Sequence, residues 1–420
     1  MRTETVKTLI VGGGLSGLCA AYSLGGEAVL LEREDEPGGL CRSFRKDGFV
    51  WDCAGHFFHF RDEVCRRFFL SLFRPEELVV RQKSCAILYR GALVGYPFQS
   101  HIHELSKEEL IDCLADLFNR PEKAEPDSFL ELLYARYGAS ITDRFLRPYN
   151  EKLYACDLAS LDPAAMGRFF PQIGPKEIVR GMKAPLDDSY NSRFFYPKNG
   201  AGALIDKLVA LLPARCLRTG SRLTALDPDS HTALDSKGRT YSYDRLICTM
   251  PLDQLLTLLG EKPEGFSRNK VLALNLGFEQ KGPIDRHWLY VPGTEARFYR
   301  LGFYDNVIDA DRASVYAEIA FPQNASVDAE AELDGALTAM RELGLIQPDN
   351  HLLASQALLL DPAYVHIRPQ TEERVRAWTE ELARRDIHCI GRYGGWRYSS
   401  MEDSMREAFA LTARLRETKT

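Results

Sequence analysis

The chain has 420 residues, of which 45% are hydrophobic and 27% charged, and its formal net charge at pH 7 is −6. This length suits two or three domains with a large core, and the composition is typical of a globular protein in solution. Because the balance is acidic and no long basic cluster occurs, nucleic acid is not expected as a partner.

The ten cysteines stand singly, without C-x-x-C pairs or the ligand spacing of a zinc or iron–sulfur site. This pattern predicts no metal site and favours a reducing compartment, the cytoplasm. The first apolar run starts within ten residues of Met1, and no run of eighteen apolar residues occurs. We therefore expect neither a signal peptide nor a membrane span.

An apolar run, a glycine cluster, an alanine-rich segment and a second apolar run follow one another in residues 8–32. Gly12, Gly14 and Gly17 have the G-x-G-x-x-G spacing at the point where a buried parallel strand turns into a helix. Glu32 ends the second run, where a carboxylate can accept hydrogen bonds from a ribose hydroxyl. The segment predicts a dinucleotide-binding unit.

The residues after this fingerprint favour FAD over NAD. The turn PGGLCR brings Arg42 toward the same pyrophosphate, and the later segment GFVWDCAGHFFHF contains Asp52 and His56. Both segments resemble flavoproteins of the amine oxidase and sugar mutase superfamily, in which the second loop runs beside the isoalloxazine. The expected FAD-binding residues are Gly12, Gly14, Leu15, Ser16, Gly17, Glu32, Arg33, Gly39, Leu40, Arg42, Gly55, His56 and Arg392.

The rest of the chain alternates between helical and strand patterns. Residues 106–151 are mostly helical and open with a capping serine, whereas residues 271–321 contain short alternating runs typical of an antiparallel sheet. Residues 191–209 predict a strand, a glycine turn and a helix, but their glycine spacing does not fit a second dinucleotide site.

These patterns predict an α/β fold with a Rossmann-like FAD-binding domain, an inserted helical domain and an antiparallel β-sheet substrate domain. The expected FAD-binding domain is discontinuous, the helical domain is a single insertion, and the sheet domain is assembled from three pieces. Their ranges are 1–75, 203–255 and 385–420 for the FAD-binding domain, 101–190 for the helical domain, and 76–100, 191–202 and 256–384 for the sheet domain.

An ordered series of motifs resembles the UDP-galactopyranose mutase family, more its eukaryotic type than its bacterial one. The motifs are the glycine fingerprint, PGGL, AGH, YPFQ, FLRPYNEKLY, WLYVP with FYR, and RYGGWRY. On its own, YPFQ is better explained by local packing at a strand end. With the resemblance it is expected to hold a uracil ring.

The resemblance assigns roles position by position. It implies that the substrate is bound by Tyr96, Phe98, Gln99, Phe145, Asn150, Tyr154 and Asn191, and that the catalytic set is Arg168, Arg300, His56, Tyr290, Tyr364 and Tyr398. Arg168 and Arg300 are expected to grip the diphosphate from two sides, because planar guanidinium groups meet phosphate oxygens bidentately. This expectation requires both guanidinium groups to face the isoalloxazine across a single cavity.

The activity that the resemblance implies is the interconversion of UDP-galactopyranose and UDP-galactofuranose, or of a related nucleotide sugar, through attack of reduced flavin N5 on the anomeric carbon. NAD(P)H is the expected reductant, and the product would serve cell wall or polysaccharide biosynthesis. Two positions depart from the family. Tyr154 stands where it usually has tryptophan, and residues 399–403 read SSMED instead of carrying N-Q-D-H. The sugar specificity is therefore open.

Two other functions stay open. One is an FAD-dependent oxidoreductase resembling amine oxidases, protoporphyrinogen oxidase or desaturases, which would accept hydride from its substrate. The other is a protein that binds flavin and a nucleotide sugar without turnover.

Overall fold

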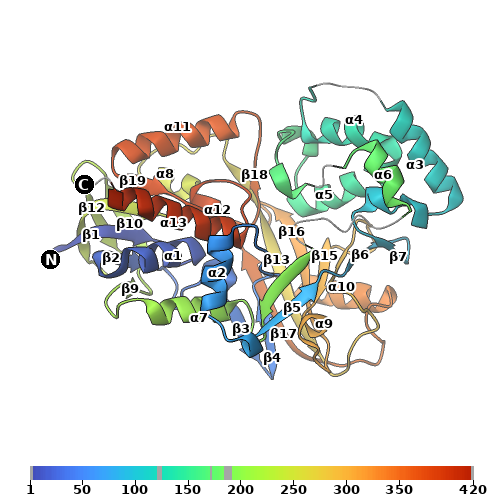
Figure 1. The fold of residues 1–420 in the computed structure, drawn as a ribbon, viewed down its shortest axis with the longest axis horizontal. Coiled ribbons are helices and arrows are strands. Elements are labelled where there is room, and N and C mark those ends of the chain that lie inside the picture. Colours follow the sequence, from blue (N-terminus) through green and yellow to red (C-terminus); the bar gives the residue numbers. More distant parts are fainter. Residues whose placement is uncertain (1–2, 121–124, 171–172, 184–191, 418–420) are drawn as a thin grey trace.

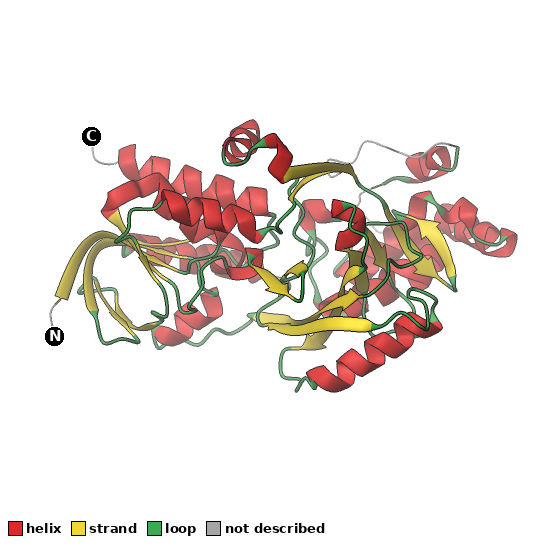
Figure 2. Ribbon diagram, turned by 90° about the horizontal axis from the view of Figure 1, so that it is seen from below, coloured by secondary structure: helices red, strands yellow, loops and turns green. Residues whose placement is uncertain are grey.

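The computed structural model describes residues 3–120, 125–170, 173–183 and 192–417. One sheet with its helices, a group of helices, and a second sheet occupy separate parts of the molecule (Figure 1). Seen from below, the strands form two groups, and helices pack against each (Figure 2). The predicted α/β fold class is confirmed, and the domain boundaries stay a prediction.

The first sheet has seven strands in the order β10-β11-β12-β1-β2-β9, with β19 also paired to β12. Strand β1 pairs in parallel with β2 and β12, and β12 pairs in parallel with β19. Their bounds are β1 (Thr3–Val11), β2 (Ala28–Leu31), β9 (Leu217–Arg218), β10 (Leu223–Asp227), β11 (Thr232–Asp235), β12 (Thr240–Cys248) and β19 (Ile387–Cys389). The carboxyl ends of the parallel strands meet at one edge, which is where ligands bind in open α/β sheets.

Both faces of β1 are covered, since the adjacent side chains of Leu9 and Ile10 are both fully buried. On one face Ile10, Leu18 and Met405 share an apolar core that joins β1 to its covering helices. The helices next to this sheet are α1 (Leu15–Leu24), α2 (Glu63–Ser71), α7 (Gly202–Leu211), α8 (Leu252–Leu258), α11 (Thr371–Arg384), α12 (Gly391–Gly394) and α13 (Met401–Glu417).

The second sheet has eight strands in the order β17-β13-β16-β15-β14-β6-β7, with β18 also paired to β13. It is antiparallel except for the β14–β6 pair. Leu272, Leu274 and Met340 belong to the core between this sheet and α10 (Ala329–Glu342). The strands are β6 (Cys85–Tyr89), β7 (Ala92–Gly95), β13 (Ser267–Phe278), β14 (Trp288–Tyr290), β15 (Arg300–Phe303), β16 (Ser314–Pro322), β17 (Leu352–Leu360) and β18 (Val365–His366).

The helices α3 (Lys107–Asn119), α4 (Phe129–Ile141), α5 (Arg147–Tyr154) and α6 (Pro175–Gly181) lie together at the upper right of Figure 1. The predicted serine cap is present, because Ser106 Oγ accepts a hydrogen bond from the Glu109 amide at 3.3 Å.

The helical pattern expected for residues 106–151 is interrupted at Gly138. Gly138 has φ 75°, and a Cβ there would lie 2.6 Å from the Asp116 carbonyl oxygen of α3. A π-helical turn at Thr142–Leu146 then precedes α5. The close approach of α3 therefore explains why helical periodicity alone did not predict the break.

Two short antiparallel ribbons connect these parts. One consists of β3 (Ser43–Lys46) and β4 (Phe49–Asp52), and the other of β5 (Leu78–Gln82) and β8 (Arg193–Pro197). The remaining short helix, α9 (Tyr304–Ile308), follows β15 within residues 271–321, where the sequence predicted strands. The β5–β8 ribbon joins residues far apart in sequence, which sequence patterns alone do not pair.

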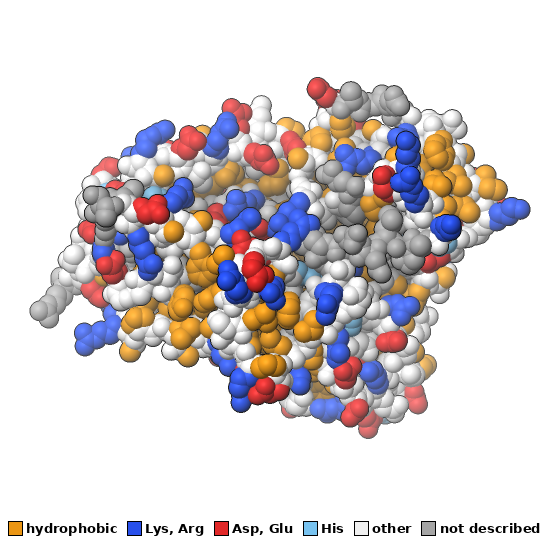
Figure 3. All heavy atoms as spheres, viewed as in Figure 1, with side chains coloured by type: hydrophobic (Ala, Val, Ile, Leu, Met, Phe, Trp, Pro, Cys, Tyr) orange, Lys and Arg blue, Asp and Glu red, His pale blue; other side chains and the backbone are white. Residues whose placement is uncertain are grey.

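Within the described ranges, no helix is long and apolar enough to cross a membrane, and no group of three or more His, Cys, Asp or Glu side chains is arranged to hold a metal ion. All ten cysteines are free. Acidic and basic side chains are interspersed on the face shown in Figure 3.

Candidate cofactor and substrate cleft

A cleft of about 710 Å³ lies where the strand ends of the first sheet face the second sheet. At one end it is lined by the glycine fingerprint, Glu32 and the PGGL turn, and at the other by Arg300, Tyr364 and Tyr398. Such a volume is typical of a cofactor site. The sequence-predicted residues that line it are Gly12, Gly14, Leu15, Ser16, Glu32, Arg33, Gly39, Leu40, Arg42, Gly55, His56, Arg300, Tyr364, Arg392 and Tyr398.

The three fingerprint glycines have different surroundings. A Cβ on Gly12 would lie 2.2 Å from Thr249 Oγ1, and a Cβ on Gly17 would lie 1.9 Å from the Gly12 carbonyl oxygen. A Cβ on Gly14 would meet nothing closer than Gly39 Cα at 4.0 Å. Packing therefore demands glycine at positions 12 and 17, whereas position 14 opens onto the cleft.

The nucleotide end fits FAD. No side chain from the described ranges caps the N-terminus of α1, so its amides are available to a pyrophosphate. The Glu32 carboxylate accepts hydrogen bonds from the amides of Gly13 at 2.7 Å and Glu34 at 2.8 Å, and it keeps further lone pairs for a ribose hydroxyl. Arg42 is held at the cleft by donating from Nε to the Gly39 carbonyl at 3.1 Å.

Asp52 fixes the loop beside the expected isoalloxazine. Its fully buried carboxylate accepts hydrogen bonds from the Ser43 hydroxyl at 2.5 Å, the Tyr196 hydroxyl at 2.9 Å and the Ala201 amide at 2.9 Å. Burial raises the pKa of Asp52 to about 7, although these donors oppose the rise. Asp52 thus joins β4 to β8 and α7.

His56 follows in the same loop and lines the cleft. Burial lowers the pKa of its imidazole to about 4, against the opposing effect of the Ala54 carbonyl, which lies 3.0 Å from Nδ1. The ring is therefore neutral at pH 7 and can act as a polar contact without carrying charge.

Arg300 begins β15 and forms an ion pair with Glu318 of β16. Its Nε and Nη2 lie 3.0 and 2.5 Å from Glu318 Oε1, and the Tyr299 hydroxyl donates to the other carboxylate oxygen. Although burial opposes the charge, Glu318 and nearby tyrosines raise the pKa of Arg300 well above its usual value. Arg300 is thus a permanent cation whose position in the cleft is fixed.

Arg392, which was expected to bind FAD, is a second cation in the cleft and lies against the tyrosines of the end opposite the glycine fingerprint. Its guanidinium carbon lies 5.1 Å from the Tyr364 ring centre and 5.3 Å from that of Tyr398, and these two rings stack 5.5 Å apart. In the described part of the chain its buried Nε has no hydrogen-bond partner. A buried guanidinium held by aromatic faces is suited to receive an anionic or carbonyl oxygen from a ligand.

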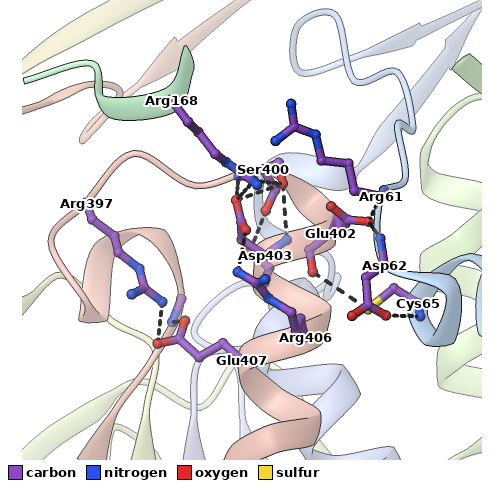
Figure 4. A network of polar contacts seen from close by, with 12 residues as sticks. Arg61, Asp62, Cys65, Arg168, Arg397, Ser400, Glu402, Asp403, Arg406 and Glu407 are labelled. Atoms are coloured by element: carbon purple, nitrogen blue, oxygen red, sulfur yellow. Dashed lines mark hydrogen bonds and ion pairs between the residues drawn. The ribbon is translucent and has the colours of Figure 1, made fainter. Parts of the chain in front are cut away.

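Arg168 lies at the rim and does not line the cleft. Figure 4 shows it reaching from its loop to the N-terminus of α13, where its Nη2 lies 2.5 Å from Asp403 Oδ2 and 3.3 Å from Ser400 Oγ. Ser400 and Asp403 also form a capping box at the start of α13, and Ser400 does line the cleft. The two expected arginines are therefore placed differently, one inside the cleft and one beside it.

Tyr96 and Phe98, which were expected to hold uracil, belong to an aromatic column next to the cleft. The rings of Phe98, Phe145 and Tyr149 stack at 5.2 and 5.3 Å. Tyr149 meets Tyr290 edge-on at 5.4 Å, and Tyr290 stacks on Tyr96 at 4.5 Å. Phe98, Phe145 and Tyr290 do not line the cleft itself.

Two amides in this region have unused hydrogen-bonding atoms. Gln99 is 1% and Asn150 2% exposed. Gln99 Nε2 and Asn150 Oδ1 have no hydrogen bond of good geometry among the described residues, although the Gln99 side chain lies near the Tyr137 hydroxyl and opposes the rise in that tyrosine's pKa caused by burial. Asn150 Nδ2 donates to the Leu146 carbonyl at 2.6 Å. Buried polar atoms are normally paired, so a free donor and a free acceptor here indicate a ligand with both kinds of group.

Tyr154 is fully buried, and its ring lies 6.0 Å from Tyr398 and 6.5 Å from Tyr364. The residue that replaces the usual tryptophan thus reaches the tyrosines of the cleft from the helical side. Asn191 lies outside the described residues.

The sequence analysis missed Glu318 and Tyr299, which orient Arg300. A glutamate inside the apolar strand SVYAEIAF was the available signal, because a carboxylate at a buried strand position needs a partner. It also gave no role to Ser43, whose hydroxyl binds both Asp52 and the Gly202 amide.

Comparison with known proteins decides the family. The family model described as flavin-containing amine oxidoreductase matches residues 15–287, well over half of the chain. The chain belongs to this family. Membership implies FAD, in agreement with the fit of the nucleotide end of the cleft.

Within the flavin-containing amine oxidoreductases, the structure resembles that of reduced UDP-galactopyranose mutase with a TM-score of 0.91 and 25% identity, over 98% of this chain and 96% of that one. An Exiguobacterium sp. 255-15 structure provisionally named protoporphyrinogen oxidase gives a TM-score of 0.77 at 19% identity, over 99% of both chains. The second likeness shows the fold alone.

Curated sequence relatives of this flavoprotein include oxidases. Coproporphyrinogen III oxidase of Staphylococcus aureus is 22% identical over 331 residues, which are 67% of this chain and 70% of that protein. The resemblance to a mutase is thus shown by structure, whereas sequence comparison finds oxidases.

Proposed function

We propose that the protein is an FAD-dependent UDP-sugar mutase that interconverts UDP-galactopyranose and UDP-galactofuranose or a closely related pair. The observation that carries the proposal is the single cleft that has the FAD-binding glycines at one end and Arg300, Arg392 and two tyrosines at the other. It is supported by the near full-length likeness to a structure of UDP-galactopyranose mutase.

Each polar residue of the second end has a role in this proposal. Arg300, held in place by Glu318, would stabilise charge on the diphosphate as it leaves the sugar. Tyr364 and Tyr398 would add directional hydrogen bonds without adding charge, since burial raises the pKa of Tyr398 well above its usual value and keeps it protonated. Neutral His56 would orient the cofactor loop without moving a proton.

FAD, when bound and reduced, would supply the nucleophile for the anomeric carbon. The residues expected to hold it are the α1 N-terminus, Glu32, Arg42 and the loop at His56. NAD(P)H is the proposed reductant, and it would have to use the same cleft because the sequence contains no second dinucleotide fingerprint.

Uracil would be held between the aromatic column and the two amides with unused atoms. A pyrimidine base presents an imide N–H beside carbonyl oxygens, so it can pair with the acceptor of Asn150 and the donor of Gln99. Arg168 would reach the diphosphate from the rim by exchanging its contact with Asp403 for phosphate oxygens.

The second candidate is an FAD-dependent oxidoreductase, which the curated oxidase relatives favour. This function does not explain the cationic, tyrosine-rich end of the cleft or the aromatic column beside it. It would be recognised by bleaching of the oxidised flavin on addition of substrate.

The decisive experiment supplies the dithionite-reduced holoprotein with UDP-galactofuranose and separates the products by chromatography. We expect UDP-galactopyranose to appear only after reduction, and an Arg300→Met variant with a full flavin content should lose the activity. If the reduced protein forms no isomer and does not bind UDP, the mutase assignment is rejected. UDP-sugar binding without turnover would instead identify a non-catalytic binding protein.

A further inference from the structure

An enclosed lysine lies at the contact between the helical part and the second sheet. Lys152 of α5 directs its ammonium group into the loop 291–298, which connects β14 to β15. Its Nζ lies 2.8–2.9 Å from four backbone carbonyl oxygens. These oxygens belong to Val291, Gly293, Ala296 and Phe298.

Among the described residues, the surroundings of this ammonium contain carbonyl acceptors but no carboxylate in an ion pair with it. A lysine ammonium has three N–H donors, and here four carbonyl oxygens surround it. The loop therefore stabilises the positive charge as a whole, beyond what one hydrogen bond would do. Burial lowers the pKa of Lys152 to about 8, although Glu295 of the same loop opposes this effect. Glu151, the neighbouring acid on α5, is engaged by Arg147 at 2.8 Å, and Arg297 is paired with Glu332.

The loop and the helix both carry residues of the proposed substrate site. Tyr290 directly precedes the loop and Arg300 begins the strand after it. Tyr149 and Asn150 lie on α5, less than one turn before Lys152. The lysine therefore bridges α5 and the β14–β15 loop. The relative position of these two elements sets where the proposed uracil-binding site, here called the base site, lies with respect to Arg300.

We propose that Lys152 is a positioning residue that, through its cage of four carbonyl oxygens, locks α5 to the β14–β15 loop and so aligns the base site with the diphosphate-binding arginine. The inference rests on the proposed function for its substrate. The cage itself does not depend on it. FAD binding should be independent of Lys152, because none of the cage residues lines the cleft.

The test uses the flavin-loaded Lys152→Ala variant, in which propylammonium can replace the missing part of the side chain. We expect the affinity for UDP to fall about tenfold while the flavin content stays unchanged. Propylammonium should restore the affinity. Tetramethylammonium at equal ionic strength should not, because it has no N–H group. Lys152→Met, which fills the aliphatic channel, should show the loss without the recovery. Lys270→Ala is the matched control, since Lys270 Nζ contacts a single carbonyl, that of Ala325, at 3.2 Å.

A second readout separates this inference from the proposed function. Propylammonium should raise the melting temperature of Lys152→Ala, and not of the wild type, whether or not UDP binds. If the wild-type protein does not bind UDP, the proposed function fails while the melting temperature still tests the cage. Unchanged UDP affinity in Lys152→Ala, or equal effects of the two ammonium ions, would overturn the inference.

Discussion

The two ends of the cleft are built in opposite ways. The nucleotide end takes its expected ligand groups, which are backbone amides, glycines and one carboxylate, from residues 12–42, and Thr249 and Gly391 of distant segments pack against this stretch. The other end uses side chains from β15, β16, α12 and the segment before α13. The ligand groups of the first are therefore set by local sequence, whereas those of the second are brought together only by the packing of distant elements.

The largest effects, on folding and on FAD binding, are expected from two separate single substitutions of fingerprint glycines. Gly17→Ala places a methyl group 1.9 Å from a carbonyl oxygen of its own turn, so it should prevent formation of a stable holoprotein. Gly14→Ala has room in the protein and should fold normally but lose most of its FAD, because only the cofactor comes close to this position. Thermal unfolding and flavin absorbance would check both outcomes. Equal behaviour of the two variants would contradict this account of the nucleotide end.

At the other end, Arg300→Met should lower the mutase rate by about 10²–10³-fold while FAD stays bound, since it removes a cation that stabilises the leaving group. It also leaves Glu318, which is 1% exposed, without its main partner. The double variant Arg300→Met/Glu318→Gln should recover stability but not activity. Recovery of activity in the double variant would show that Arg300 serves only to neutralise Glu318.

Asp52 connects distant segments beside the cleft, since its carboxylate at the end of β4 accepts hydrogen bonds from the Tyr196 hydroxyl and the Ala201 amide. Its folded-state pKa of about 7 is above the ordinary value of 3.8. The folded state therefore binds more protons between these values, and stability falls as pH rises through this window. Between pH 5.5 and 8 the wild type should lose about 2 kcal/mol more unfolding free energy than Asp52→Asn. Denaturant titrations at both pH values would measure it, and parallel losses would place the pKa of Asp52 near its ordinary value.

The smallest effect concerns the base site. Gln99→Met removes a buried amide whose Nε2 makes no hydrogen bond of good geometry in the described part of the chain, although it lies near the Tyr137 hydroxyl. Because an unpaired buried donor costs free energy, the free protein should be as stable as the wild type or more so. UDP affinity should fall about tenfold, as measured by calorimetry. Unaltered UDP affinity would remove Gln99 from the substrate site.

The same contrast explains what could be predicted from the sequence. The turn at residues 12–17, Glu32 and Arg42 lie within one supersecondary unit, so spacing alone located the nucleotide end of the cleft. The pairing of Arg300 with Glu318 and the attachment of Arg168 to Asp403 depend on strand register and on the return of the last helix. No local pattern encodes those distances, and the resemblance alone pointed to these arginines.

The last helix, α13, also limits when the cofactor site can form during synthesis. The first sheet includes β19, which pairs with β12. In α13, Glu407 accepts a hydrogen bond from the Gly391 amide, and Glu402 accepts hydrogen bonds from the amides of Arg61 and Asp62. Residues 1–75, although synthesised earlier, therefore stay without these partners until residues 387–407 have emerged. FAD should be captured late, after the helical part and the second sheet have been translated, and a ribosome-bound chain stalled before residue 387 should not retain it.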